Sequence, residues 1–361
     1  MKALSKVVTA YRKRPALLAF FCLGTAVFLS GCSQKVEPWR FSGPTMGTQY
    51  NVAVVPPKVV PPNGERNEGF SCDRAELAKR IENSLAQTNQ QMSHYIADSE
   101  LSKLSAMAAG ESAQLSADME KVLRLSERLY KLSDGAFDIT IGPLVNLWGF
   151  GPKSSPEDAV PSEAQIADAM ALSGGDSIEI SGSSLKKGKA VELNLSAVAK
   201  GYGADKVAEA LESCGAFNYL VEVGGELMLK GMSHRGTPWK IAVEKPSSSL
   251  AGQSSQRLIA VSDKGVATSG DYRNYFEKEG VRYSHTIDPR TGRPITHALA
   301  SVTVLAASSA EADAWATVIT VAGPEQGMAL AEQENLAVFM LVKTNSGFKE
   351  KYSSAFATYV Q

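Results

Sequence analysis

Asp313 and Thr317 are the pair of residues whose types and spacing most directly suggest chemistry. They lie four residues apart in the run 312–317, whose pattern predicts a helix. Residues at positions i and i+4 share one helix face, so this carboxylate and this hydroxyl could give two oxygens to one hard cation such as Mg²⁺. An ordinary helix start with an acidic residue in its first turn has the same spacing. The pair alone therefore does not establish a metal site.

The run 195–201 suggests a site for an anion. A short apolar stretch, 191–195, leads there into a predicted helix that begins with the small residues Ser196, Ala197 and Ala199. Free backbone N–H groups at a helix N-terminus favour an anion such as a pyrophosphate. Many junctions between a strand and a helix carry small residues, however, so this pattern is not specific.

Six short motifs, taken together and in order, are specific. They are the runs 43–48 (Gly-Pro-Thr-Met-Gly-Thr), 134–138 (Asp-Gly-Ala-Phe-Asp), 195–202, 267–272 (Ala-Thr-Ser-Gly-Asp-Tyr), 284–294 (with Asp-Pro-Arg-Thr-Gly) and 312–317. In this order they resemble the ApbE family, whose members are FAD:protein FMN transferases. The resemblance runs from about residue 41 to the C-terminal strand, so it covers nearly the whole mature chain.

The resemblance implies roles for individual residues. It assigns a metal to the backbone carbonyl of Ala197 and to the side chains of Asp313 and Thr317. It assigns FAD contacts to Met46, the ring of Tyr95, a backbone-lined stretch at Ala136, Phe137 and Asp138, then Asn194, Lys200 beside the pyrophosphate, His285 and Ile287. Asn194 stands where the family usually has Asp, so this contact keeps an acceptor oxygen but loses a charge. Taken by themselves, Met46 and Tyr95 are more typical of core packing, and His285 of a structural histidine.

The reaction implied by the resemblance is Mg²⁺-dependent transfer of FMN from FAD to a threonine or serine hydroxyl of a target protein, with release of AMP. Mn²⁺ would suit the same oxygens. His285 and Asp271 are both candidate bases for the hydroxyl proton. The expected acceptors are subunits of membrane redox complexes on the exported side. Two other functions are an FAD pyrophosphatase, which gives FMN and AMP, and a lipid-tethered flavin-binding protein without catalysis, which would not need the Asp313–Thr317 pair.

Residues 1–31 have the pattern of a bacterial lipoprotein signal peptide. Basic residues precede an apolar run, 16–29, that is too short for a stable membrane span. The run 29–32, Leu-Ser-Gly-Cys, then matches the lipobox. We expect Cys32 to carry lipid, palmitate included, although a plain secretory signal with a chance cysteine is the alternative. Residues 32–38 would be a tether, and 39–361 a single catalytic domain anchored to a bacterial membrane and facing the periplasm.

The composition is that of an ordinary globular protein. The chain of 361 residues is 44% hydrophobic and 21% charged, with a formal net charge of −1. There is no basic excess to neutralise phosphates, so nucleic acid is not expected as a partner. Of the four cysteines, Cys72 and Cys214 remain once Cys22 is removed and Cys32 is lipidated. They could pair in an exported compartment, or they could stay free thiols.

Hairpin connections outnumber βαβ units in the predicted elements. Helices are expected at 73–89, from about 99, and at 116–132, 197–213, 311–321 and 325–334. Strands are expected at 41–55, interrupted by the 43–48 turn, and at 191–195, 219–223, 226–229, 239–243, 258–261, 282–287, 301–305, 337–342 and 356–360. The segments 56–70 and 151–165 are predicted loops. We therefore predict an α+β fold with largely antiparallel sheets and packed helices.

Overall fold

The structure, a computed structural model, describes residues 37–56, 71–152, 160–243, 257–270, 275–278 and 281–360. The predicted signal segment, Cys32 and the candidate base Asp271 lie outside the described residues. Val36–Gln361 form one compact unit, and the fold is that of this unit. Within the described ranges, no helix is long and apolar enough to cross a bilayer.

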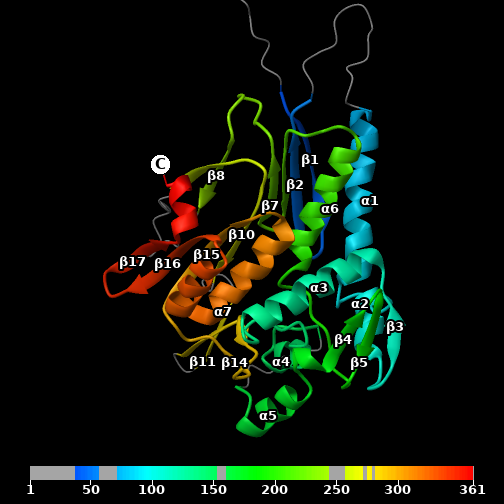
Figure 1. Ribbon diagram of the computed structural model, residues 1–361, viewed down its shortest axis with the longest axis vertical. Coiled ribbons are helices and arrows are strands. Elements are labelled where there is room, and N and C mark those ends of the chain that lie inside the picture. Colours follow the sequence, from blue (N-terminus) through cyan, green and yellow to red (C-terminus); the bar gives the residue numbers. More distant parts are fainter. Residues whose placement is uncertain are drawn as a thin grey trace, which may run out of the picture. The chain divides into compact units, whose positions relative to one another are not determined.

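An eight-stranded sheet forms the centre of the unit, in the order β1-β2-β6-β7-β10-β15-β16-β17 (Figure 1). All neighbouring strands in it are antiparallel. The strands are β1 Trp39–Thr45, β2 Thr48–Val54, β6 Tyr219–Val223, β7 Glu226–Lys230, β10 Lys264–Gly270, β15 Leu299–Ala306, β16 Ala337–Thr344 and β17 Gly347–Tyr352. The predicted α+β fold with largely antiparallel sheets is confirmed.

Helices cover one face of this sheet in two layers (Figure 1). The inner helices α6 and α7 pack on the strands, while α1 packs on α6 and α3 on α7. The helices are α1 Arg74–Met92, α2 Glu100–Ala106, α3 Ala117–Leu132, α4 Gly142–Leu147, α5 Glu163–Ala171, α6 Ala199–Ser213 and α7 Ser309–Gln333. Side chains of Asp73, Ser99 and Ser116 cap α1, α2 and α3, which explains why the predicted helix starts are accurate.

The opposite face of the sheet is covered by a hairpin and a short 3₁₀ helix. The hairpin is β8 Trp239–Val243 with β9 Arg257–Val261, and the 3₁₀ helix is Ser354–Tyr359. Trp239, Phe339 and Phe356 belong to the buried cluster on this side. Smaller sheets are β3 Ser112–Gln114, β4 Ile178–Ser181 and β5 Ser184–Lys187; β11 Tyr275–Lys278 and β12 Val281–Ser284; and β13 Ile287–Asp288 and β14 Arg293–Pro294.

Cys72 and Cys214 form a disulfide, with an S–S distance of 2.03 Å. The sequence left their pairing open. Cys72 lies just before α1 and Cys214 just after α6, so the bond joins the start of one helix to the end of the other. The two helices therefore run antiparallel, and the end of α1 lies near the start of α6.

Two predicted strands are wrong. The segment 191–195 makes only an isolated parallel bridge, between Ile141 and Glu192. Its alternating apolar side chains are buried in the core, and no strand among the described residues pairs with them. The segment 356–360 lies mostly in the 3₁₀ helix Ser354–Tyr359. The neighbouring position beside β16 is occupied by β17, whose charged residues are typical of an edge strand and hid it from the sequence pattern.

Other elements differ from their predictions in extent. The helices expected at 311–321 and 325–334 are one element, α7, with a kink where Gly323 has φ of 80° before Pro324. The predicted loop 151–165 lies partly outside the described residues, and its last part is helical from Glu163. Strand β10, in the middle of the sheet, was not predicted. Its sequence Lys-Gly-Val-Ala-Thr-Ser-Gly is poor in typical strand residues.

Candidate active site

Two tight turns meet at one end of the central sheet. Met46 and Gly47 connect β1 to β2 with φ of 47° and 72°, as a two-residue hairpin loop of this kind requires. Gly224 and Gly225 connect β6 to β7, and the Gly224 N–H donates to the Gln49 carbonyl at 3.0 Å. The turn that carries the predicted FAD contact Met46 therefore lies beside the Gly-Gly turn.

The start of α6 lies against both turns. A Cβ added to Gly203 in α6 would be 3.2 Å from the sulfur of Met46. A Cβ added to Gly224 would be 3.1 Å from Cδ of Lys200. These are tighter than ordinary van der Waals contacts, so the glycines allow the close approach. The structure thus brings together Met46 and Lys200, which lie far apart in the sequence.

Asn194 shapes the turn into α6. Its Oδ1 accepts a hydrogen bond from the Ser196 N–H at 2.9 Å, and its own N–H donates to the Ile139 carbonyl at 2.7 Å. An aspartate could accept the same bond from Ser196. The departure from the family pattern at Asn194 therefore preserves this turn.

Three charged side chains gather where α6 begins. Lys200 forms an ion pair with Glu226, the first residue of β7. Asp313, from α7, accepts the Gly201 N–H through Oδ2 at 3.0 Å. The Gly201 N–H belongs to the first turn of α6, where backbone donors have no partner within the helix. Asp313 therefore completes the N-terminus of a helix that lies far from it in the sequence.

Burial sets the charge states in this cluster. It raises the pKa of Asp313, although Lys200 and the Gly201 N–H favour the charged carboxylate. Burial, with repulsion from Asp313, raises the pKa of Glu226 to about 7, and Lys200 opposes this rise. Burial lowers the pKa of Lys200, but the Asp313 and Glu226 carboxylates outweigh it, so the pKa of Lys200 is raised. Two buried carboxylates thus share one ammonium group, and a second cation beside them would relieve their repulsion.

The oxygens at this place fit a hard cation. Glu226 Oε2 is buried without a hydrogen-bond partner in the described part of the chain. Ala197 lies two residues before α6 begins at Ala199, and the Gly201 N–H bonds to Asp313 rather than to the Ala197 carbonyl. Thr317 is half-buried, one helical turn beyond Asp313 on α7.

One or two carboxylates with neutral oxygens are a ligand set that hard cations such as Mg²⁺ accept. The described residues contain no group of three or more His, Cys, Asp or Glu side chains that could hold a metal. An ion bound by Asp313, with the Glu226 carboxylate nearby, would complete its ligands with neutral oxygens, water and substrate phosphates. This is the manner in which proteins usually bind Mg²⁺.

Tyr95 lies just beyond the end of α1, and 69% of its surface is exposed. Its ring centroid is 4.3 Å from that of His94. An interpretation of Tyr95 as a core residue is therefore wrong. Because the end of α1 lies near the start of α6, Tyr95 is on the same side of the unit as the Lys200 cluster, with its ring available to a flat ligand.

The side chains of Ala136, Phe137 and Asp138 are committed to the fold. Ala136 and Phe137 are only 1% and 2% exposed. Asp138 accepts hydrogen bonds from the N–H and hydroxyl of Thr140 at 2.8 and 2.7 Å, and from the Gly175 N–H at 3.0 Å. Burial raises the pKa of Asp138, while these bonds oppose the rise. These side chains are therefore used in packing and hydrogen bonding, and Asp138 lines a cavity of about 470 Å³.

His285 and Ile287 lie in the segment between β12 and the Asp-Pro-Arg-Thr-Gly turn. The His285 ring meets the Phe150 ring edge-on, with centroids 6.3 Å apart. Ile287 is 4% exposed and belongs to a cluster with Trp148, whose Nε1 donates to the Gly292 carbonyl at 2.8 Å. The Ile287 side chain is therefore used in packing, and its backbone is the part that could contact FAD.

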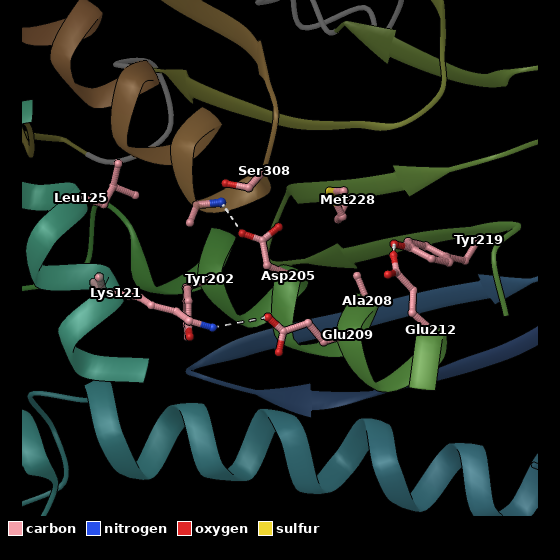
Figure 2. Close-up of a pocket in the computed structure, with 12 residues that line it drawn as sticks. Lys121, Leu125, Tyr202, Asp205, Ala208, Glu209, Glu212, Tyr219, Met228 and Ser308 are labelled. Carbon is pink, nitrogen blue, oxygen red and sulfur yellow. Dashed lines mark hydrogen bonds and ion pairs between the residues drawn. The ribbon is translucent and has the colours of Figure 1, made fainter. Parts of the chain in front are cut away.

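Two acidic residues that the sequence analysis missed are central to this arrangement. Glu226 directly follows the Gly-Gly turn, in a hairpin that also carries Glu222 and Lys230, so the sequence contained no signal specific to it. Asp205 lies one turn beyond Gly201 on α6 and lines a cavity of about 340 Å³ (Figure 2). The predicted site residues do not line this cavity.

Comparison with known proteins identifies the family. A model of the ApbE family matches residues 46–340. The chain belongs to the ApbE family. A FAD:protein FMN transferase of Vibrio cholerae serotype O1 is 44% identical over 339 residues, which are 94% of this chain and 97% of the relative. A FAD:protein FMN transferase of Haemophilus influenzae is 41% identical over 337 residues, 92% of this chain and 94% of the relative.

Solved structures of the ApbE family have the same fold. The flavin transferase ApbE from Vibrio cholerae matches with a TM-score of 0.81 and 43% identity, over 90% of this chain and 99% of that chain. The flavinyl transferase ApbE of Pseudomonas stutzeri, in its apo form, matches with a TM-score of 0.80 and 38% identity, over 90% and 97%. The resemblance and the fold class inferred from the sequence are both confirmed.

Proposed function

We propose that this ApbE-family enzyme transfers FMN from FAD to a threonine or serine hydroxyl of a target protein. The hydroxyl oxygen attacks the phosphorus on the FMN side of FAD, and the bond from that phosphorus to the bridging pyrophosphate oxygen breaks. AMP leaves with this oxygen, FMN stays attached through a phosphoester, and the hydroxyl proton passes to a base. The relatives named above are FAD:protein FMN transferases.

The observation that carries this proposal is the cluster at the start of α6. The Lys200 ammonium and the positive end of the α6 dipole suit a pyrophosphate, although the first-turn Ala199 and Gly201 N–H groups already have acceptors. The buried Asp313 carboxylate faces the same helix end at the Gly201 N–H. An anionic ligand beside a buried carboxylate requires a cation between them, so the cluster suits FAD together with a divalent ion rather than FAD alone.

Each predicted residue then has a role in the proposed site. Ala197, Asp313 and Thr317 would hold Mg²⁺, which when bound neutralises charge on the pyrophosphate. Lys200 adds its ammonium to the same phosphates, and Tyr95 packs on the flavin ring. The other FAD contacts are Met46, Ala136, Phe137, Asp138, Asn194, His285 and Ile287. His285 and Asp271 are the two candidates for the base that removes the hydroxyl proton.

We further propose that Cys32 is lipidated and anchors the protein to a bacterial membrane, with the catalytic domain facing the periplasm. The Cys72–Cys214 disulfide supports an oxidising compartment. Trp39, where β1 begins, is at the end of the sheet opposite the Met46–Gly47 turn. Acceptor subunits of membrane redox complexes would be the enzyme's substrates on the periplasmic side of the membrane.

Incubating the purified protein with FAD, Mg²⁺ and a redox-complex acceptor subunit tests the proposal. FMN transfer predicts covalent flavin fluorescence on the acceptor and an equal amount of AMP. An acceptor with its target threonine or serine replaced by alanine is the control and should stay unlabelled. Free FMN and AMP without labelled protein would instead indicate a pyrophosphatase, and unchanged FAD a non-catalytic flavin-binding protein.

A further inference from the structure

Helices α6 and α7 each provide a carboxylate to the N-terminus of the other. Asp313 of α7 accepts the Gly201 N–H at 3.0 Å. Asp205 of α6 accepts the N–H groups of Ser309 at 2.7 Å and Ala310 at 2.9 Å. First-turn N–H groups have no partner within their own helix, and a carboxylate there is also favoured by the helix dipole. Each helix therefore caps the other.

The two caps are spaced alike and leave little room for adjustment. Gly201 and Asp205 are one turn apart on α6, as Ser309 and Asp313 are on α7. A Cβ added to Gly201 would lie 2.3 Å from the Ser309 carbonyl oxygen and 2.8 Å from Cβ of Asp313. The two backbones thus touch at this crossing. The position of the first turn of α7 on α6 therefore determines the position of Asp313.

Asp205 holds this first turn from the α6 side. Figure 2 shows its carboxylate pointing from α6 toward the start of α7 beside Ser308, at the edge of the cavity of about 340 Å³. Ser308 caps its own helix, accepting the Glu311 N–H at 3.2 Å. Ser309 Oγ is buried without a hydrogen-bond partner among the described residues, so it does not contribute to the attachment.

We propose that Asp205 is a positioning residue of the transfer site. By fixing the first turn of α7 on α6, it keeps Asp313 on the Gly201 N–H, where the carboxylate can hold a cation on the pyrophosphate of FAD. Asp205 acts through α7 and not by contact with the ligand. The inference rests on the proposed function, because it takes Asp313 as a metal ligand.

The test compares Asp205→Ala and Asp205→Asn with Glu209→Gln. Asp205→Ala removes both acceptor oxygens, whereas Asp205→Asn keeps one. Glu209 is a matched control, because it lies one turn further along α6, lines the same cavity and pairs with Lys206 and Lys121 rather than with α7. If Asp205→Ala does not fold, Asp205→Asn is measured in the same way.

Amide hydrogen exchange without ligand measures the positioning directly. In Asp205→Ala, exchange of the Gly201 amide should become about tenfold faster, while that of Val207 in the middle of α6 stays unchanged. Asp205→Asn should be intermediate, and Glu209→Gln should match the wild type. Unchanged exchange at Gly201, or equal acceleration at Gly201 and Val207, would mean that Asp205 supports only the fold and would overturn the proposal.

Titration of FAD binding with Mg²⁺, followed by flavin fluorescence, measures the consequence for the site. Asp205→Ala should raise the Mg²⁺ concentration for half-maximal binding about tenfold, with FAD affinity in chelator unchanged. A Mg²⁺ requirement that stays at the wild-type value would overturn the positioning role. If the wild type itself shows no Mg²⁺ dependence, the proposed metal site fails, and exchange at Gly201 still decides whether Asp205 positions Asp313.

Discussion

Helices α1 and α6 lie side by side (Figure 1) and run antiparallel, and their two ends are built differently. At one end, the Cys72–Cys214 disulfide joins the helices covalently, and Leu77 and Leu211 are fully buried. At the other end, α1 leads into the exposed Tyr95, and α6 begins at the buried charges around Lys200. One end is crosslinked and apolar, and the other combines buried charges with an exposed aromatic ring.

This difference shows how the fold can hold an unfavourable group of charges. Burying carboxylates with too few partners reduces stability, and Glu226 Oε2 is such an unsatisfied oxygen among the described residues. The disulfide closes a loop of 142 residues and restricts the unfolded chain. The crosslinked end can therefore offset the cost of the charged end, and changes at the two ends should have separable effects.

Asp313→Ala should have the largest effect and should act on catalysis. It removes the only formal charge among the proposed metal ligands, so FMN transfer should fall on the order of a hundredfold to a thousandfold. Thr317→Ala should be milder, because water can replace a neutral ligand. Transfer rates at several Mg²⁺ concentrations measure both effects. A folded Asp313→Ala protein with wild-type activity that chelator still abolishes would place the metal elsewhere.

Cys214→Ser should act on stability. Loss of a crosslink across 142 residues should lower the free energy of unfolding by about 4–5 kcal/mol. Denaturant unfolding measures the loss, and reduced wild-type protein is the control that should match the variant. FMN transfer well below the unfolding temperature should persist. Loss of transfer in a variant that is still folded would show that the two ends are coupled.

Tyr95→Ala should weaken FAD binding about fivefold, because stacking of an aromatic ring contributes about 1 kcal/mol. Since Tyr95 is 69% exposed, melting of the FAD-free protein should not change. Flavin fluorescence titration and a thermal melt measure the two quantities, and Tyr95→Phe should bind FAD like the wild type. A large fall in the melting temperature would give Tyr95 a structural role at this end.

The pH dependence of stability should show the burial of Asp205. Burial raises the pKa of Asp205 to about 7, although its two N–H donors oppose the rise. An unfolded aspartate has a pKa of about 3.9, so between these values the unfolded chain has lost a proton that the folded protein keeps. This contribution to stability is complete below about pH 4 and is lost as the pH rises to about 7.

Unfolding from about pH 5 to about pH 8 measures this contribution. The wild type should lose stability more steeply than Asp205→Asn over this range. Glu209→Gln is the control and should keep the wild-type slope. Parallel curves for the wild type and Asp205→Asn would show that Asp205 titrates as an exposed aspartate does.

Cys32→Ala should change location and leave transfer unaffected. The proposed tether enters β1 at the sheet end opposite the Met46–Gly47 turn. Loss of the lipid should therefore not change the rate of FMN transfer. Membrane fractionation and the transfer assay test the two parts. A variant that is processed yet remains tightly bound to membranes would contradict lipid anchoring at Cys32.

The sequence by itself predicted the elements that local signals specify. Side-chain caps and apolar periodicity located α1, α2 and α3, and the Gly-Gly turn located the β6–β7 hairpin. It did not locate β10. The glycine at 265 weakens the strand pattern but is required, because the backbone of Ser308 and Ser309 would lie 2.1–2.3 Å from a Cβ there. Tertiary packing therefore decided a residue that local propensity disfavours.

The motifs of the sequence also predicted the family and named Lys200 and Asp313, but not the contacts between them. The pairing of Cys72 with Cys214, the buried position of Glu226 and the attachment of α7 by Asp205 appear only in the folded chain. The disulfide, the Lys200–Glu226 ion pair and the Asp205 hydrogen bonds all join residues that are distant in sequence. A local sequence pattern carries no information about which distant backbone donor or charge a side chain will contact. These polar groups are removed from water only when the helices pack, so helix packing decides whether each of them has a hydrogen-bond or ion-pair partner.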